Sequence, residues 1–120
     1  MQVGDKVYLL PVGNSARPYR NSDRNIRDGI KEDKIIKIGR KYFYLENENE
    51  NKFSLEYMHD VSDYSAEWEV YLSKQAVLDV IEKTELERAV RRQLDWSSLQ
   101  HLSLNQLRRI KAIIEEEKDE

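Results

Sequence analysis

The sequence predicts an α+β domain: a small, mostly antiparallel, five-stranded barrel-like sheet followed by two C-terminal helices. Short runs of β-branched and aromatic residues occur throughout residues 1–72, as strands require. After residue 73, apolar residues recur every three or four positions, which is helical spacing. A chain of 120 residues with 39% hydrophobic content supplies one modest core. We therefore expect a single domain, in which residues 73–120 form a helical hairpin packed on residues 1–72.

Five segments have the length and composition of strands. The first is an apolar run that follows a Gly4-Asp5 turn, and we expect it to stop before Pro11, because proline cannot donate to a sheet ladder. The next two flank Gly39-Arg40, and two intervening residues that include a glycine predict a tight hairpin. The last two alternate polar and apolar residues, as half-buried strands do. The expected strands are residues 3–10, 34–38, 41–45, 52–56 and 67–72.

Two stretches lack a regular pattern. Residues 12–31 are polar and contain Gly13, Pro18 and Gly29, so we expect a long loop there. A loop of this length is uncommon in a compact domain and is typically functional or mobile. Residues 57–66 are expected to form an irregular connection between the last two strands.

The helix starts are marked by capping residues. Ser103 is followed three residues later by Gln106, which is the capping-box pattern. Ser73 is the expected cap of the earlier helix, and we expect that helix to break at residues 95–98. The acidic residues 115–120 are expected to fray at the end of the last helix.

The composition excludes several classes of function. No apolar run approaches the roughly 20 residues that span a bilayer, and residues 1–6 lack the basic and apolar regions of a signal peptide. The sequence has no cysteine, so it offers no thiol nucleophile, disulfide or cysteine-ligated zinc. Imidazole chemistry is limited to two histidines. We therefore expect no contact with a membrane and no cofactor.

The net charge of −3 hides an uneven distribution. Residues 1–45 contain ten basic and five acidic residues, a balance of +5. Residues 46–120 contain ten basic and eighteen acidic residues, a balance of −8. Such asymmetry bears on the choice of partners. We expect the basic half to meet phosphates or an acidic protein surface, and the acidic half to repel nucleic acid.

Eight residues of the basic half form the candidate partner-binding site. Six lie in the 12–31 loop, where cations and one aromatic side chain would track phosphates and stack on a base. Two lie at the tip of the expected hairpin, which in a small barrel can contact a nucleic-acid groove. The alternative is that both groups are ordinary solvated charges. The eight residues are Arg17, Tyr19, Arg20, Arg24, Arg27, Lys31, Arg40 and Lys41.

Aromatic residues alternate along the expected third strand. Tyr42 and Tyr44 share one face, and Phe43 lies on the other. One set is expected in the core, and the other set on the surface, where aromatic residues with a polar group favour interfaces. The sequence leaves open which set points inward.

Catalytic patterns are weak. The sequence contains neither a phosphate-binding Gly-x-x-x-x-Gly-Lys-Ser/Thr loop nor a Gly-x-Ser-x-Gly elbow. Neither His59 nor His101 has a second histidine at metal-ligand spacing. Asp23 or Asp28 with Glu32-Asp33-Lys34 loosely matches metal-dependent nucleases, but the two aspartates lie in an expected loop. We expect no enzyme activity and no metal site.

Several motifs resemble those of a known class of proteins. Small β-barrel proteins encoded by phages and prophages, of the Src-homology-3-like or KOW-like kind, have segments similar to Val3-Gly4-Asp5-Lys6-Val7-Tyr8, Gly39-Arg40-Lys41-Tyr42-Phe43-Tyr44 and Tyr71-Leu72-Ser73-Lys74-Gln75. The Leu-Ser-x-x-Gln-Leu pattern of residues 102–107 is similar to their last helix. The resemblance implies a phage-type origin. Phage accessory proteins of this size include inhibitors of host defence, CRISPR nucleases among their targets.

We therefore expect a non-enzymatic binding protein that occupies a surface of a host protein machine in the cytoplasm of a bacterial host. Its partner is expected to be a host or phage protein. The alternative is a nucleic-acid-binding small-barrel module that uses the basic loop and the hairpin, directly or within a protein–nucleic-acid complex. Salt separates the two, because counterion release makes nucleic-acid affinity fall steeply with salt.

Overall fold

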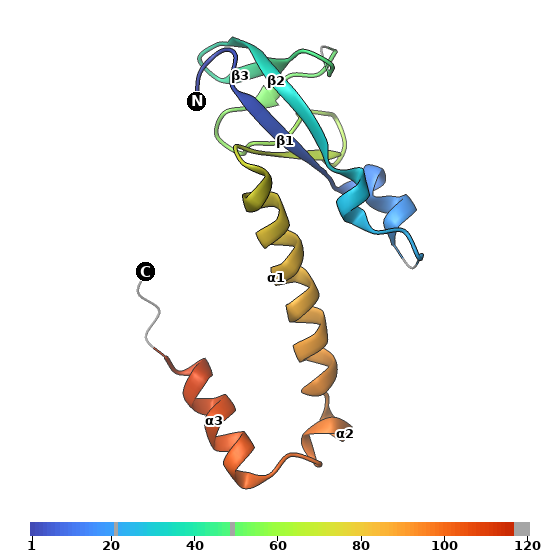
Figure 1. The fold of residues 1–120 in the computed structure, drawn as a ribbon, viewed down its shortest axis with the longest axis vertical. Helices are drawn as coiled ribbons and strands as arrows, with labels where there is room; N and C mark the ends of the chain where they lie inside the picture. Colours follow the sequence, from blue (N-terminus) through green and yellow to red (C-terminus); the bar gives the residue numbers. More distant parts are fainter. Residues whose placement is uncertain (21, 49, 117–120) are drawn as a thin grey trace. The chain divides into compact units, whose positions relative to one another are not determined.

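The chain folds as an α+β protein in which the strands precede the α-helices (Figure 1). The computed structural model describes residues 1–20, 22–48 and 50–116. Antiparallel strands form a five-stranded half-barrel in the order β4-β3-β2-β1-β5, which confirms the predicted class. The strands are β1 (Lys6–Pro11), β2 (Lys31–Ile38), β3 (Tyr42–Leu45), β4 (Phe53–Ser54) and β5 (Trp68–Tyr71).

The chain divides into two compact units, residues 1–82 and residues 83–120. Within the described residues, three α-helices follow β5, because the predicted break contains one helical turn of its own. No helix of the described part is long and apolar enough to cross a membrane. Residues 115–120 were predicted to fray at the end of the last helix. Four of them, residues 117–120, lie outside the described residues. The helices are η1 (Gly13–Tyr19) and η2 (Ile26–Gly29), both of the 3₁₀ type, and α1 (Lys74–Gln93), α2 (Trp96–Leu99) and α3 (Leu104–Ile114).

The helix starts follow their caps. Ser103 and Gln106 form a complete capping box, in which Ser103 Oγ accepts from Gln106 N (3.1 Å) and Gln106 Oε1 accepts from Ser103 N (2.8 Å). Ser73 Oγ accepts a backbone N–H of the first turn of α1 (3.1 Å). Asp95 caps α2, and hydrogen bonds from Ser98 hold the pKa of this carboxyl below its ordinary value. The packing of a helical hairpin on the sheet stays a prediction.

The main core lies inside the half-barrel. On β3, Phe43 and Leu45 are fully buried, whereas Tyr42 and Tyr44 are partly exposed, because successive side chains of a strand point to opposite faces. Phe43 stacks on Phe53 of β4 with the ring centroids 5.5 Å apart. The tyrosines are therefore the outward set. The other buried members of this core are Val7, Leu9, Ile35 and Val70.

A second apolar cluster joins the sheet to the start of α1. Val77 is fully buried and Ile81 nearly so, and both pack with Leu10 of β1. Tyr71 packs against the same cluster and donates its hydroxyl to Glu69 Oε1 (2.8 Å). Burial and this hydrogen bond to a carboxylate raise the pKa of Tyr71 above its usual value.

Residues 58–61, expected to be part of an irregular connection, lie between the two edge strands of the half-barrel. On one side, Ser54 N of β4 donates to the His59 carbonyl (2.9 Å). On the other side, Val70 N of β5 donates to the Met58 carbonyl (2.8 Å). The segment therefore bridges β4 and β5 through backbone hydrogen bonds.

Three local features differ from their predicted form. Three residues, not two, separate β2 from β3, and Gly39 does not take the left-handed conformation of a tight two-residue turn. The expected loop of residues 12–31 contains η1 and η2, and β2 already begins at Lys31. Pro11 is the last residue of β1 and does not follow it, because a proline at a strand end leaves most of the ladder intact.

Candidate functional site

The predicted basic loop is braced by two of its own arginines. Arg20 Nη2 donates to the first carbonyl of η1 (3.0 Å). Arg27 Nη1 lies 3.4 Å from Asn25 Oδ1, which itself accepts from the Arg27 backbone N–H (3.0 Å). Arg17 and Arg24 are exposed. These last two are the loop cations best placed to meet a partner.

Tyr19, predicted as a stacking surface, packs inside the loop. A Cβ atom on Gly29 would come within 2.7 Å of Tyr19 Cζ, so the ring lies directly against this glycine. Tyr19 is accordingly half-buried. The contact ties the end of η1 to the end of η2 and leaves little of the ring for a ligand.

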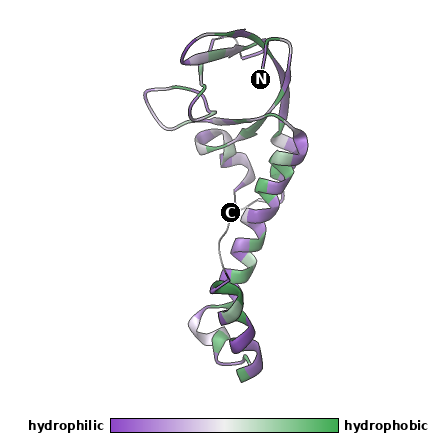
Figure 2. Ribbon diagram, turned by 90° about the vertical axis from the view of Figure 1, so that its left-hand side faces the viewer, coloured by the Kyte–Doolittle hydropathy of each residue, from purple (hydrophilic) through white to green (hydrophobic). Residues whose placement is uncertain are grey.

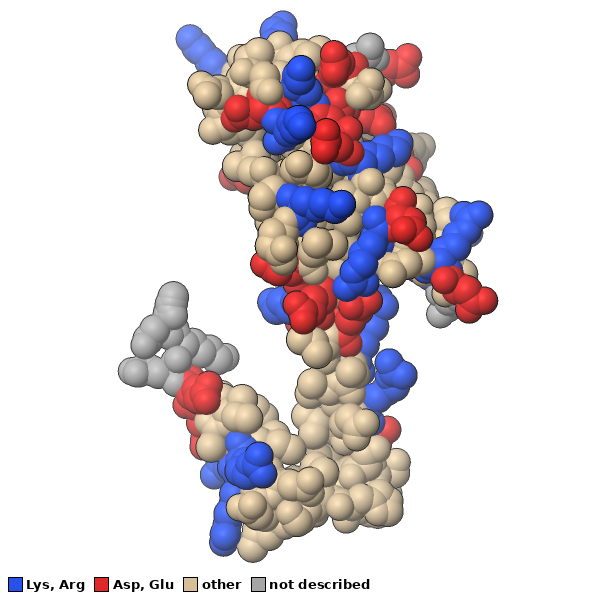
Figure 3. All heavy atoms as spheres, viewed as in Figure 1, with Lys and Arg blue, Asp and Glu red and all other residues tan. Residues whose placement is uncertain are grey.

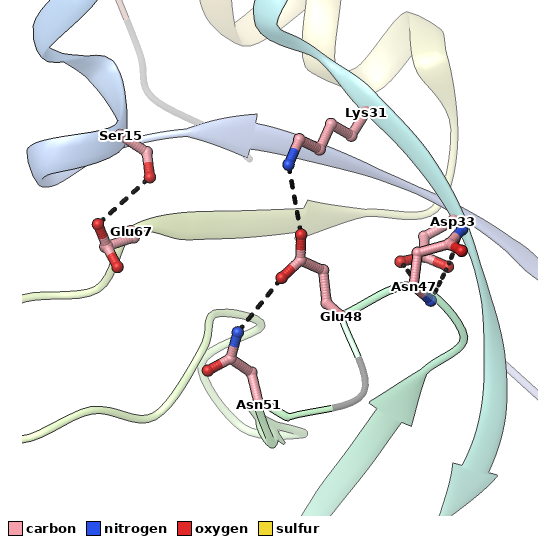
Figure 4. Close-up of polar contacts among 7 residues, drawn as sticks. All are labelled: Ser15, Lys31, Asp33, Asn47, Glu48, Asn51 and Glu67. Carbon is pink, nitrogen blue, oxygen red and sulfur yellow. Dashed lines mark hydrogen bonds and ion pairs between the residues drawn. The ribbon is translucent and has the colours of Figure 1, made fainter.

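Lys31 is engaged by two structural partners. Its Nζ lies 3.3 Å from Glu48 Oε1 and 4.5 Å from the centre of the Trp68 ring. Figure 4 shows Lys31 extended toward Glu48, whose other carboxylate oxygen accepts from Asn51 Nδ2 (3.3 Å). Both contacts are attractive for a cation. Lys31 thus links the start of β2 to β5 and to the turn after β3.

Charges of both signs are mixed on the half-barrel. In the view of Figure 3, Lys and Arg atoms over the strands lie among Asp and Glu atoms and form no single broad patch. Lys6 Nζ and Glu32 Oε2, 3.8 Å apart, are one such exposed pair, and pairs of this kind contribute little to stability. The basic excess of the first half is therefore not a continuous face in this view.

An open hollow of about 670 Å³ is lined by the β2–β3 hairpin and by residues 54–66. Its volume falls within the range of known ligand sites. Two exposed cations line it from the hairpin, and ring-bearing side chains line it from β3 and from residues 57–64. We name this feature the aromatic hollow. Its defining residues are Arg40, Lys41, Tyr42, Tyr57, His59 and Tyr64.

The rings of the aromatic hollow are unusually accessible. Tyr57 and His59 stack with their centroids 5.7 Å apart and an angle of 13° between the planes. Tyr57 is nevertheless 65% exposed, and Tyr64 is 89% exposed. Lys52 adds a cation whose Nζ lies 4.5 Å from the centre of the Tyr42 ring. Large exposed apolar surface next to polar groups is typical of interaction sites.

The turn that carries these rings is held by backbone contacts. Ser54 Oγ accepts from Tyr57 N (3.1 Å), and the Ser54 carbonyl accepts from Met58 N (2.9 Å). Met58 has a φ of 56°, a left-handed conformation that costs a non-glycine residue about 1 kcal/mol or more. His59 Nδ1 lies 2.8 Å from the Asp60 carbonyl. Because a carbonyl only accepts, Nδ1 is the donor in this contact.

The buried side chain of Asp60 connects the same turn to the start of β5. It is 4% exposed, and its Oδ1 accepts from Glu67 N and Trp68 N, both at 2.8 Å. Its charge is therefore used by backbone amides at the start of β5. The other acidic residue that lines the hollow, Glu56, is exposed. Among the lining residues, two exposed cations thus accompany one exposed carboxylate, and Lys52 adds a third cation beside the Tyr42 ring.

Comparison with known proteins assigns the chain to a family. A family model described as the phage ProQ C-terminal-like domain matches residues 1–118. The chain belongs to this family. No curated protein and no solved structure matches it. Membership confirms the phage-type origin that the motifs predict, and the half-barrel with C-terminal helices agrees with it.

This phage ProQ C-terminal-like domain brings together only some of the residues predicted to bind a partner. Of the eight, Arg40 and Lys41 line the aromatic hollow. The sequence argument missed Tyr57, His59 and Tyr64, because residues 57–66 were expected to be a mere connection. A signal was present: three ring-bearing side chains occur within residues 57–64, among serines and aspartates. Rings in a polar loop favour a binding role over packing.

The residues that loosely match a nuclease do not converge in this phage ProQ C-terminal-like domain. Glu32 is exposed beside Lys6. The next residue, Asp33, is buried, and its Oδ1 accepts from Asn47 N (3.1 Å) and from Asn47 Nδ2 (3.3 Å) (Figure 4). The two carboxylates therefore lie on opposite faces of β2. Within the described ranges, no group of side chains is arranged to hold a metal ion. The lack of enzyme activity stays a prediction.

Proposed function

We propose that this phage ProQ C-terminal-like domain binds nucleic acid and that the aromatic hollow is its contact surface. One observation carries the proposal: Tyr57, 65% exposed, lines the same hollow as the hairpin cations Arg40 and Lys41. ProQ-like domains are associated with nucleic-acid binding, which supports it. The same proposal includes an SH3-like or KOW-like barrel and an action in the cytoplasm of the host.

The hollow offers cations for the phosphates of a nucleic acid and aromatic rings for its bases. Cations neutralise phosphates and release the counterions condensed on them, which supplies affinity without sequence preference. Exposed rings stack on bases, because every base has a π-face. Binding by these contacts involves no chemical step. The domain acts by occupancy alone.

Charge reversal at the hairpin tests the proposal. Arg40→Glu combined with Lys41→Glu is expected to weaken oligonucleotide binding at least tenfold at low salt. Each lost phosphate contact also lowers the slope of log affinity against log salt by roughly 0.7–0.9. Anisotropy titrations at several salt concentrations measure both quantities. Both side chains are exposed, so the midpoint of unfolding should not move.

A charge-matched control separates local contacts from net charge. Lys34→Glu combined with Lys74→Glu makes the same change in net charge at exposed positions that do not line the hollow. This variant is expected to keep most of the affinity and the full salt slope. An unaltered slope in the hairpin variant, or an equal loss in the control, would contradict the proposal.

Binding to a host protein machine, such as inhibition of a CRISPR nuclease or another host defence, is a second candidate. It rests on apolar side chains that are more than half exposed on the helices of the second unit, and Figure 2 shows apolar positions along these helices. Exposed apolar groups of this kind favour protein contacts. Capture of one specific host protein that persists after nuclease treatment of the lysate would support this candidate. The side chains are Leu86, Val90, Trp96, Leu104, Ile113 and Ile114.

A further inference from the structure

The Tyr57 ring is stacked on one neighbour, and the residue is otherwise largely exposed. His59 stacks against this ring at 5.7 Å between centroids, with the planes only 13° apart. The side chain nevertheless remains 65% exposed. Aromatic rings favour offset, nearly parallel stacking, so a further planar ring can extend this pair. The hollow thus offers a flat stacking surface for a planar ligand.

This stacking surface is built before any ligand arrives. Two hydrogen bonds to Ser54 hold the backbone at Tyr57 and Met58. Met58, between Tyr57 and His59, has a left-handed backbone with φ at 56°, and such strained residues cluster at functional sites. The contact from Nδ1 to the Asp60 carbonyl fixes the orientation of the His59 ring. A site ordered in advance loses less freedom on binding and gains affinity.

The hollow therefore suits a ligand that joins a planar ring to an anion, as a nucleotide does. In a duplex the faces of the bases are covered by their neighbours, and a protein reads only their edges in the grooves. Unpaired bases expose their faces and stack on aromatic side chains. We propose that the aromatic hollow binds single-stranded nucleic acid, with a base on Tyr57 and phosphates at Arg40 and Lys41. This inference rests on the proposed function and adds the strand state of the ligand.

The experiment compares three fluorescent probes of one mixed sequence: a single-stranded RNA and a single-stranded DNA of about 12 nucleotides, and a DNA duplex of the same length. All are titrated with the full chain at one low salt concentration. At least one single strand is expected to bind about tenfold more tightly than the duplex, and the two single strands show which sugar is preferred. Tyr57→Ala is expected to lose about tenfold in single-strand affinity. Tyr57→Phe keeps the ring and should stay within about twofold of wild type.

Two further variants guard against effects on folding. Tyr64→Ala changes a side chain that is 89% exposed, so it leaves the fold intact, and it should weaken single-strand binding severalfold. Tyr44→Ala removes an outward tyrosine of β3 that does not line the hollow, and it should bind as wild type does.

The outcomes distinguish the inference from the proposed function. If Tyr57→Ala and Tyr64→Ala bind normally, or if the duplex binds as tightly as both single strands, the hollow does not hold an unpaired base. The proposed function then stands only if Arg40→Glu with Lys41→Glu still lowers affinity. If neither single strand nor duplex binds the wild-type chain at low salt, the proposed function fails, and the inference fails with it.

Discussion

Asp60 connects the buried interior of the half-barrel to its exposed rings. Its carboxylate accepts hydrogen bonds from Glu67 N and Trp68 N at 2.8 Å while the residue is 4% exposed. An ionised acceptor makes stronger bonds to backbone amides than a neutral one. His59 directly precedes Asp60 in the chain, and Tyr57 lies three residues before it. The stability of this anchor therefore governs how well the rings are held.

The first prediction concerns this anchor. Asp60→Ala is expected to lower the free energy of unfolding by about 3 kcal/mol, because two backbone amides lose their charged acceptor and a buried side chain is removed. Asp60→Asn keeps a side-chain oxygen at the same place and should cost only about 1 kcal/mol. Urea denaturation monitored by tryptophan fluorescence measures both. Equal losses in the two variants would show that the acceptor oxygen is not the source of the stability.

At the scale of elements, local signals predicted structure well. The capping box of Ser103 and Gln106 lies within four residues, and the structure contains it in full. The places of the five strands were also predictable, because β-branched and aromatic runs favour strands, although β4 is limited to Phe53–Ser54. The β2–β3 hairpin was predicted at the right place and in the wrong form. Its shape follows from the pairing of Ile38 with Phe43. This pairing leaves residues 39–42 between the paired positions, which is more than the two residues of a tight turn.

Contacts between residues far apart in the chain could not be predicted from the sequence. Isolated β-bridges pair Phe53 with Asp60 and His59 with Glu69. No local sequence pattern predicts pairings of this kind. The contact between Lys31 and Trp68 likewise joins residues far apart in the chain. The cations of the aromatic hollow were therefore predictable from a turn. Its rings could be noticed in residues 57–64 of the sequence, but their place beside Arg40 and Lys41 follows only from the long-range pairing of this segment with β4 and β5.

The second prediction concerns the start of α3. Ser103→Ala is expected to destabilise this helix by about 1 kcal/mol, because the amide of Gln106 loses its acceptor. Hydrogen exchange of the α3 amides should then accelerate roughly fivefold, while amides of the sheet keep their rates. Ser103→Asp retains a capping oxygen and should exchange as wild type does. Unchanged exchange in the alanine variant would mean that the cap does not support the helix.

At the scale of the whole molecule, the sign of the charge changes within each half of the sequence, and not only between the two halves. Between Arg88 and Lys111, six basic residues accompany a single acidic one, Asp95. Arg88, Arg91 and Arg92 line an open hollow together with Asp95. The balance of −8 over residues 46–120 conceals this basic stretch. A shorter counting window would have revealed it, because the acidic excess of the second half is not spread evenly along the chain.

The third prediction concerns steering by the basic loop. Arg17→Glu combined with Arg24→Glu reverses two exposed cations that are not used to brace the loop. The association rate constant for an oligonucleotide is expected to fall about tenfold at low salt, because local potential accelerates encounter. The dissociation rate should change little. Stopped-flow fluorescence measures both rates.

The charge-matched control described above, Lys34→Glu with Lys74→Glu, applies to this prediction as well. It should slow association much less than the loop variant does, since it changes net charge without changing the loop. Equal slowing in both variants would mean that net charge, and not the loop, steers the ligand.

The bridge formed by residues 58–61 has a consequence for aggregation. An uncovered sheet edge presents unpaired N–H and C=O groups to other chains and invites edge-to-edge association. Here one segment hydrogen-bonds to both β4 and β5, so a change that loosens it would uncover two edges at once. We therefore expect substitutions that adapt the hollow to a new ligand to be tolerated best at Tyr57 and Tyr64, because neither residue belongs to the bridging segment 58–61. We expect the bridging backbone to tolerate less alteration, because a change there would free backbone groups of both strands.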